Sequence, residues 1–146
     1  MGFSWIMDIY RVPFNSVAPM WLKVRPFLDA ALKKYGVNER FPLDCVLADL
    51  VSGKSQLWII VDADKIVSAT VTEVEEYPLG KQLIIFLMGG DSMQDWGDLL
   101  HNAMVKYAKE VGAKWIDTGS RRGIGKMFYD RLGYTRKYET YSFEVK

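Results

Sequence analysis

The sequence predicts an α/β fold in which a mixed, mostly antiparallel sheet carries helices on both faces. Two segments rich in β-branched residues, 56–62 and 65–75, are separated only by a tight turn, which is typical of antiparallel strands. The apolar segment 82–88 is followed by a long amphipathic helix and a short strand, which indicates a parallel crossover. The expected order of elements is β-α-α-β-β-β-α-β-α-β.

The first part of the chain predicts one strand and two helices. Residues 5–12 are a strand candidate that ends at a proline. Apolar residues recur at helical spacing over 16–35, and Pro26 within this helix predicts a kink or a restart. A shorter helix is predicted over 42–51, where a glycine soon follows as a stop signal.

The central part predicts three strands and the clearest helix. Apolar and polar residues alternate along 65–75, whereas 82–88 is almost wholly apolar, as expected of a strand buried on both faces. The helix that follows repeats its apolar residues at i, i+3, i+4 and i+7 up to Val111, and Ser92 or Asp95 is expected to cap it.

The last part predicts a short strand over 114–118, a short helix ended by Gly133, and a final strand over 138–145. The sequence contains no internal repeat, low-complexity tract or linker. Residues 1–146 are therefore expected to form one domain, which is long enough to bury a core.

Composition and charge narrow the classes of function. Hydrophobic residues make up 49% of the chain, which argues against long disordered stretches. The net charge of +1 gives no electrostatic case for nucleic acid or an anionic membrane as the main partner. No apolar run approaches the ~20 residues of a membrane span, and no signal peptide pattern opens the chain, so a cytoplasmic protein is expected.

The chain has one cysteine, Cys45, and one histidine, His101. A single cysteine forms no disulfide within the chain, which suits a reducing compartment. Metal sites built from cysteine and histidine are excluded, as is nucleophilic catalysis of the Ser-His-Asp or Cys-His kind unless the two residues meet. Both are expected in the core or on a helix surface.

Residues 119–126, GSRRGIGK, look like a loop that binds phosphate, but they fail both common patterns. A P-loop would need glycine at Ser120 and a hydroxyl at Met127. The dinucleotide fingerprint would need a third glycine at Phe128. We interpret the segment as the start of the last helix, where Ser120 serves as an N-cap or as a hydrogen-bonding partner for a ligand.

Residues 128–134, FYDRLGY, are similar in type and spacing to the late motif F-Y-x-x-x-G-[FY] of the GNAT superfamily of acyl-CoA-dependent N-acyltransferases. Together with the element order over residues 6–145, they make the chain resemble this superfamily. The resemblance implies a GNAT fold and transfer of an acetyl group from acetyl-CoA to an amine of a small molecule or protein. Shorter segments, among them Leu57-Trp58 and Arg122-Gly123, resemble small GNAT-like proteins of tailed bacteriophages.

The resemblance fails where GNAT proteins hold the CoA pyrophosphate, with the pattern [QR]-x-x-G-x-[GA] between the fourth strand and the long helix. Residues 120–125 nearly fit this pattern, but they lie one strand and one helix too late. The equivalent segment is 89–97, in which Asp91 stands where Gln or Arg belongs. Asp91 and Asp95 would repel a pyrophosphate by ~1 kcal/mol or more, and basic residues from the last helix are expected to compensate.

The resemblance also implies roles for single residues. Tyr129 falls at the position of the acid that protonates the leaving thiolate, although its ring could instead pack under the sheet. Glu73 is the expected base, directly or through a water molecule, with Asp117 and Asp91 as rivals. The backbone N–H of Met88 or Gly89 would polarise the thioester, and Trp96 would contact the cofactor or close the core. The expected cofactor-binding residues are Leu87, Met88, Gly89, Gly90, Gln94, Asp95, Trp96, Gly97, Arg122 and Lys126.

Two functions therefore remain open. The first is an acetyltransferase with an amine acceptor; the second is an inactive GNAT-fold protein that binds a partner or builds a phage virion, as the lost pyrophosphate pattern favours. A partner chain could complete the sheet beside the short C-terminal segment, which would suit a homodimer or a virion assembly. No metal, membrane or nucleic acid is expected as a partner, and the compartment is the cytoplasm, or the host cytoplasm or virion for a phage protein.

Overall fold

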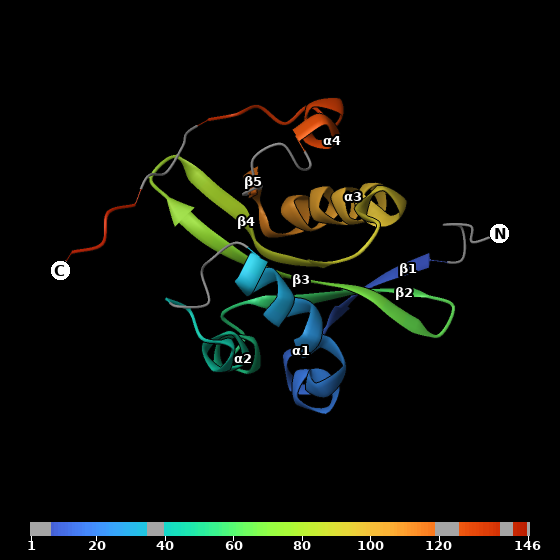
Figure 1. Ribbon diagram of the computed structural model, residues 1–146. Helices are drawn as coiled ribbons and strands as arrows, with labels where there is room; N and C mark the ends of the chain where they lie inside the picture. The colour runs from blue at the N-terminus through green and yellow to red at the C-terminus, as the bar shows by residue number, and fades with distance from the viewer. Residues whose placement is uncertain (1–6, 35–39, 119–125, 138–141, 146) are drawn as a thin grey trace.

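The computed structural model describes residues 7–34, 40–118, 126–137 and 142–145. It confirms the predicted element order up to the last helix (Figure 1). The elements are β1 (Met7–Val12), the 3-10 turn η2 (Phe14–Ser16), α1 (Val17–Lys34), α2 (Leu43–Val51), β2 (Gln56–Asp62), β3 (Lys65–Tyr77), β4 (Gly80–Gly90), α3 (Met93–Val111), β5 (Ala113–Thr118) and α4 (Lys126–Arg131).

The five strands form one sheet in the order β1-β2-β3-β4-β5. β1, β2, β3 and β4 pair antiparallel in that order. Short turns join β2 to β3 and β3 to β4, whereas α1 and α2 lie between β1 and β2. β5 runs parallel to β4, because the long helix α3 carries the chain back across the sheet. The predicted mixed, mostly antiparallel sheet is thus confirmed.

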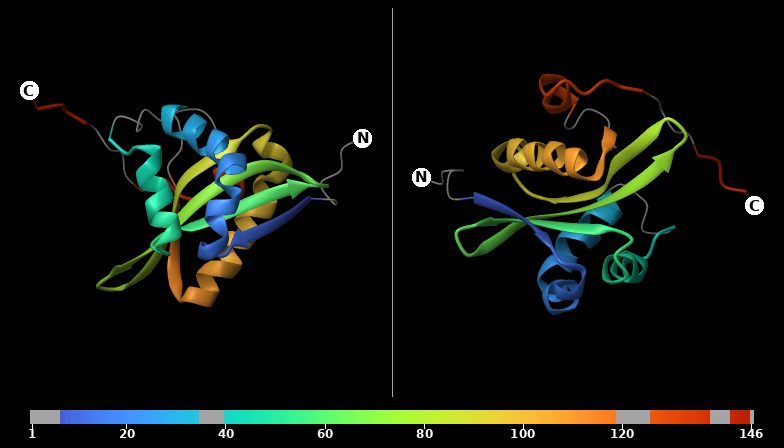
Figure 2. Two further views of the ribbon diagram at one scale, coloured as in Figure 1. Left: turned by 90° about the horizontal axis from the view of Figure 1, so that it is seen from below. Right: turned by 180° about the vertical axis from the view of Figure 1, so that it is seen from behind.

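Helices cover both faces of this sheet. α1 and α2 lie on one face, and α3 and α4 lie on the other (Figures 1 and 2). The first face encloses a core built around Val24, Leu28 and Leu57. The second encloses a core built around Trp96, Leu100 and Met104. The two-sided burial stabilises the sheet because both of its faces are withdrawn from water.

β3 is buried on both faces, although its sequence alternates between apolar and polar residues. Ala69 and Val71 pack in the core under α1, while Ser68, Thr70 and Thr72 are buried on the α3 side. The Thr72 hydroxyl accepts a hydrogen bond from the indole of Trp58 and donates one to Gln56. The polar side of β3 is covered because β3 is the middle strand of the sheet.

The predicted restart at Pro26 does not occur, because α1 continues through Pro26 as one helix. Pro26 and Leu22, whose carbonyl loses its helical donor, both lie on the exposed side of α1, where water can replace that bond. The final strand is not formed over residues 142–145; its other half, 138–141, lies outside the described residues.

In the described part of the chain, no helix combines the length and the apolar character that crossing a membrane requires. Over the same residues, no group of three or more His, Cys, Asp or Glu side chains could hold a metal ion. Cys45 is exposed on α2, whereas His101 lies on α3 on the other face of the sheet, so the two residues do not meet.

Candidate functional site

β4 extends beyond the end of β5. Their last pair is Ile85 with Thr118, the last residue of β5, and β4 continues to Gly90 paired with β3. The edge of β4 beyond this pair is called the gap between β4 and β5. Phe86 is an extra residue in the β3–β4 ladder, and both Phe86 and Leu87 pack on the α1 side, as a β-bulge requires. Beyond Ile85, the edge of β4 that faces β5 has no strand partner among the described residues.

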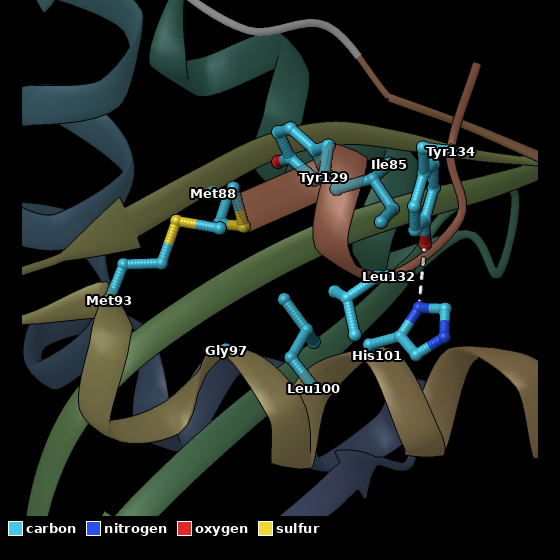
Figure 3. Close-up of a pocket in the computed structure, with 9 residues that line it drawn as sticks. All are labelled: Ile85, Met88, Met93, Gly97, Leu100, His101, Tyr129, Leu132 and Tyr134. Carbon is cyan, nitrogen blue, oxygen red and sulfur yellow. Dashed lines mark hydrogen bonds between the residues drawn. The ribbon is translucent and has the colours of Figure 1, made fainter. Parts of the chain in front are cut away.

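A pocket lies over this gap, between β4, α3 and α4 (Figure 3). Its walls are mainly apolar, and its polar groups are an imidazole and two phenols. The cavity is about 10 Å³, which is room for one water molecule. The lining residues are Ile85, Met88, Met93, Gly97, Leu100, His101, Tyr129, Leu132 and Tyr134.

Tyr129 lies on α4, half-buried at the edge of the gap. Its hydroxyl oxygen is 3.5 Å from the hydroxyl oxygen of Thr118, the last residue of β5 to pair with β4. Its ring contacts the ring of Tyr134 edge-on, with centroids 5.2 Å apart. The phenol predicted to act as an acid is therefore next to the place where the two strands separate.

The spacing of the FYDRLGY motif follows from the way α4 ends. The N–H of Tyr134 donates to the carbonyl of Tyr129 at 3.0 Å, and the N–H of Gly133 donates to the carbonyl of Asp130 at 3.1 Å. Gly133 has a φ of +90°, so these bonds form the Schellman motif that glycine allows at a helix end. This backbone geometry turns Tyr134 back over Tyr129.

His101 holds the other end of Tyr134. Its Nδ1 atom is 2.9 Å from the Tyr134 hydroxyl oxygen, and the two rings are 5.3 Å apart (Figure 3). Burial, followed by the neighbouring Tyr129, raises the pKa of Tyr134 to about 12. The phenol is therefore protonated at neutral pH, and it donates to His101 in the tautomer that carries the imidazole proton on Nε2. Sequence analysis placed His101 in the core or on a helix surface and missed this contact, because no local pattern links residues 33 positions apart.

Glu73 lies on the opposite face of the sheet from Tyr129. Side chains two residues apart share a face of a strand, and Val71 packs under α1. Burial raises the pKa of Glu73, Lys54 opposes this, and Asp49 adds to it. The structure thus places the predicted acid and base on different sides of the sheet, and Glu73 does not line the pocket that contains Tyr129.

Glu73 and Asp117 flank Ile84 on that face. The ladder pairs Ile84 with Glu73 on β3 and with Asp117 on β5. Directly paired residues point to the same face of a sheet, so the two carboxylates form one row with Ile84 between them. This row lies one pair before the point where β4 and β5 separate.

The junction between β4 and α3 is short and acidic. Only Asp91 and Ser92 separate the two elements, and Asp91 and Asp95 are exposed. Ser92 occupies the N-cap position with a φ of +59°, but its side chain makes no capping hydrogen bond. A Cβ atom at Gly89 would collide with the carbonyl of Phe27, so close packing against α1 explains this glycine.

Trp96 belongs to the core. It is 2% exposed, and its indole N–H donates to the carbonyl of Asp91 at 2.8 Å. Of the other predicted cofactor-binding residues, Met88 and Gly97 line the pocket, and Gln94 and Asp95 are exposed at the start of α3. Leu87 packs in the core on the α1 side, Gly90 ends β4, Arg122 lies outside the described residues, and α4 begins at Lys126.

No protein-family model and no curated protein matches the sequence. Solved structures do match the fold of the chain. A probable acetyltransferase has a TM-score of 0.73 at 13% identity, with 95% of this chain and 99% of its own chain covered. An aminoglycoside acetyltransferase from an uncultured soil metagenomic sample has a TM-score of 0.69 at 16% identity, covering 97% and 96%.

An acetyltransferase predicted for Clostridium acetobutylicum, solved with acetyl-CoA, has a TM-score of 0.69 at 15% identity, covering 94% of this chain and 96% of its own. At such identities the likeness concerns the fold alone. The chain has the fold of GNAT acetyltransferases, as the order of its elements and the FYDRLGY motif predicted.

Proposed function

We propose that the protein is an N-acyltransferase that moves an acetyl group from acetyl-CoA to an amine. The observation that carries this proposal is the position of Tyr129, whose hydroxyl lies beside the gap between β4 and β5. The fold supports it, because structural neighbours are acetyltransferases and one was solved with acetyl-CoA. The acceptor is an amine of a small molecule or a protein.

The unpaired edge of β4 suits the thioester. A backbone N–H of Met88 or Gly89 would polarise the thioester carbonyl, since this part of β4 has no strand partner among the described residues. The arm of the donor would follow the pocket between α3 and α4. A cavity of about 10 Å³ is too small for it, so side chains that line the pocket have to shift when the donor binds.

The two faces of the gap suit an acid and a base. The acceptor amine would approach from the side of Glu73, which takes its proton directly or through water while the C–N bond forms. The C–S bond then breaks, and the thiolate takes the proton of Tyr129 on the other face. The amine and the thiolate are thereby kept on different sides, which agrees with the positions of Glu73 and Tyr129 on opposite faces of the sheet.

The acidic start of α3 does not fit a pyrophosphate by itself. Asp91 and Asp95 are both exposed there, and their charges oppose an anion. We propose that Arg122 and Lys126 offset this charge from the segment that leads into α4. Gln94 and the backbone of Gly90 would supply further hydrogen bonds.

The same acidic junction favours a second candidate function. A protein that has lost acetyl transfer and uses the fold to bind a partner would need neither an open pocket nor a pyrophosphate site. The small cavity and the exposed Asp91 and Asp95 support this alternative, and a virion component of a bacteriophage would be one such protein.

Titration of acetyl-CoA into the protein by calorimetry decides between the two functions. We expect a dissociation constant of about 1–100 μM at moderate salt, which corresponds to roughly 5–8 kcal/mol of binding free energy. Desulfo-CoA, which lacks the thioester, is the matched ligand control. Absence of heat up to about 1 mM acetyl-CoA would contradict the acetyltransferase and support the binding protein.

The pH dependence of acetyl transfer should follow Glu73. A base acts when deprotonated, so the rate is expected to rise with pH through the pKa of Glu73, which burial raises above its usual value. Glu73→Gln should remove this acidic limb and lower the rate by about 100-fold. Glu76→Gln, on the exposed end of β3, is the control. An unchanged pH profile in Glu73→Gln would favour Asp117 as the base.

A further inference from the structure

We propose that His101 is a positioning residue: through its hydrogen bond to Tyr134 it fixes the Tyr129 phenol relative to the gap between β4 and β5. This inference rests on the proposed acetyl transfer. It assigns a role to the one histidine of the chain, which the acid and base chemistry leaves unused.

The contacts form a chain from α3 to the acid. His101 is on α3, a long helix that packs on the sheet through Trp96, Leu100 and Met104 and so provides a fixed base. Its Nδ1 atom lies within hydrogen-bond distance of the Tyr134 hydroxyl oxygen, at 2.9 Å. Tyr134 in turn is joined to Tyr129 twice, by its N–H bond to the Tyr129 carbonyl and by ring contact. A shift of Tyr134 therefore shifts Tyr129.

A second contact between α3 and α4 is weaker. Arg131 and Asp98 form an ion pair at 3.1 Å, but both side chains are 58% exposed. Exposed pairs contribute about 0–1 kcal/mol, because water screens the charges. The bond between His101 and Tyr134 is half-buried inside the pocket, where a hydrogen bond holds its geometry better. It is the contact best able to set the position of α4.

The helix α4 needs such a tie because it is short. It spans Lys126–Arg131, six residues, and isolated helices of that length are not stable in water. Misplacement of a catalytic group by about 1 Å can lower a rate by about 100-fold. Loss of the bond is therefore expected to reduce turnover with little effect on donor binding.

The test measures CoA release from acetyl-CoA with hydroxylamine as the acceptor. His101→Phe and Tyr134→Phe should each lower kcat by about 10- to 100-fold and change the KM for acetyl-CoA by less than about threefold. His101→Gln keeps an acceptor and should recover most of the loss. The double variant should be no slower than either single variant, because both substitutions remove the same hydrogen bond.

Two further measurements keep the outcomes distinct. Asp98→Asn, which removes the exposed ion pair at the same helix contact, is the matched control and should keep the kcat of the unchanged protein. Hydrogen exchange over residues 126–134 should become faster in His101→Phe but not in Asp98→Asn. This readout does not depend on catalysis, so it tests the tie even where acetyl transfer is absent.

Equal kcat in His101→Phe and the unchanged protein would overturn the proposal, as would unchanged exchange over residues 126–134. Equal loss in His101→Phe and Asp98→Asn would also overturn it, because any weakening of the helix contact would then suffice. No CoA release by the unchanged protein, with no binding of acetyl-CoA, would instead contradict the proposed function itself.

Discussion

Replacement of Tyr129 by Phe is expected to lower the rate of acetyl transfer by about 100- to 10,000-fold, the range of general acid catalysis. The affinity for acetyl-CoA should change by less than about threefold, because the variant keeps the ring and loses only the hydroxyl. We expect no larger effect on activity from any other single substitution described here.

The physical reason lies in the leaving group. A thiolate has to gain a proton as the C–S bond breaks, and a phenol with a pKa near 10 can supply one. The Tyr129 hydroxyl lies 3.5 Å from that of Thr118, at the end of the paired part of β5. The Tyr129 ring would keep its contact with Tyr134 in the variant, so the fold of α4 should survive.

Single-turnover measurement of CoA release separates this effect from binding. Tyr10→Phe, which removes a phenol hydroxyl from an exposed position on β1, should behave as the unchanged protein. Unaltered chemistry in Tyr129→Phe would show that Tyr129 only packs under the sheet, the alternative that the sequence left open.

Local sequence patterns were sufficient for most of the fold. The alternation along 65–75 and the apolar run 82–88 gave correct strands, because strand formation depends on which residues face a core. The resemblance of FYDRLGY to the GNAT motif was informative for a local reason too. Its glycine and last aromatic residue, Gly133 and Tyr134, form one Schellman motif, in which every bond is made within six residues.

The parts that the sequence did not predict depend on long-range contacts. His101 and Tyr134 meet only because α4 folds back over α3, and no spacing rule connects them. The alternation of β3 showed that Glu73 and Val71 share a face, but the helix that covers this face is set by the topology. For that reason the separation of the acid from the base became visible only in the structure.

The short junction before α3 could be only partly described from the sequence, for a related reason. Glycines 89 and 90 suggested donors for a cofactor, and the structure adds a second reason for Gly89, which is the close approach of Phe27. The sequence showed the acidic residues near Gly89 but not the length of the loop between β4 and α3. In the structure only Asp91 and Ser92 separate these two elements. A glycine pair in a sequence thus has two readings, close packing and ligand approach, and only the fold distinguishes them.

Replacement of Trp96 by Ala is expected to destabilise the protein by about 3–5 kcal/mol, the usual loss when a large buried aromatic residue is truncated. Trp96 is 2% exposed and lies among Leu100, Met104 and other residues of the core under α3. The variant also leaves the carbonyl of Asp91 without its indole donor. A change of this size is a large fraction of the stability of an ordinary domain.

Urea denaturation followed by circular dichroism measures this loss. Trp115→Ala on β5, where the residue is 44% exposed, is the matched control and should lose less than about 1.5 kcal/mol. If Trp96 instead contacts the cofactor, its alanine variant would keep its stability and lose affinity for acetyl-CoA. Trp96→Phe separates the two roles further: it retains much of the apolar volume, so it should recover part of the stability, while the bond to Asp91 stays lost.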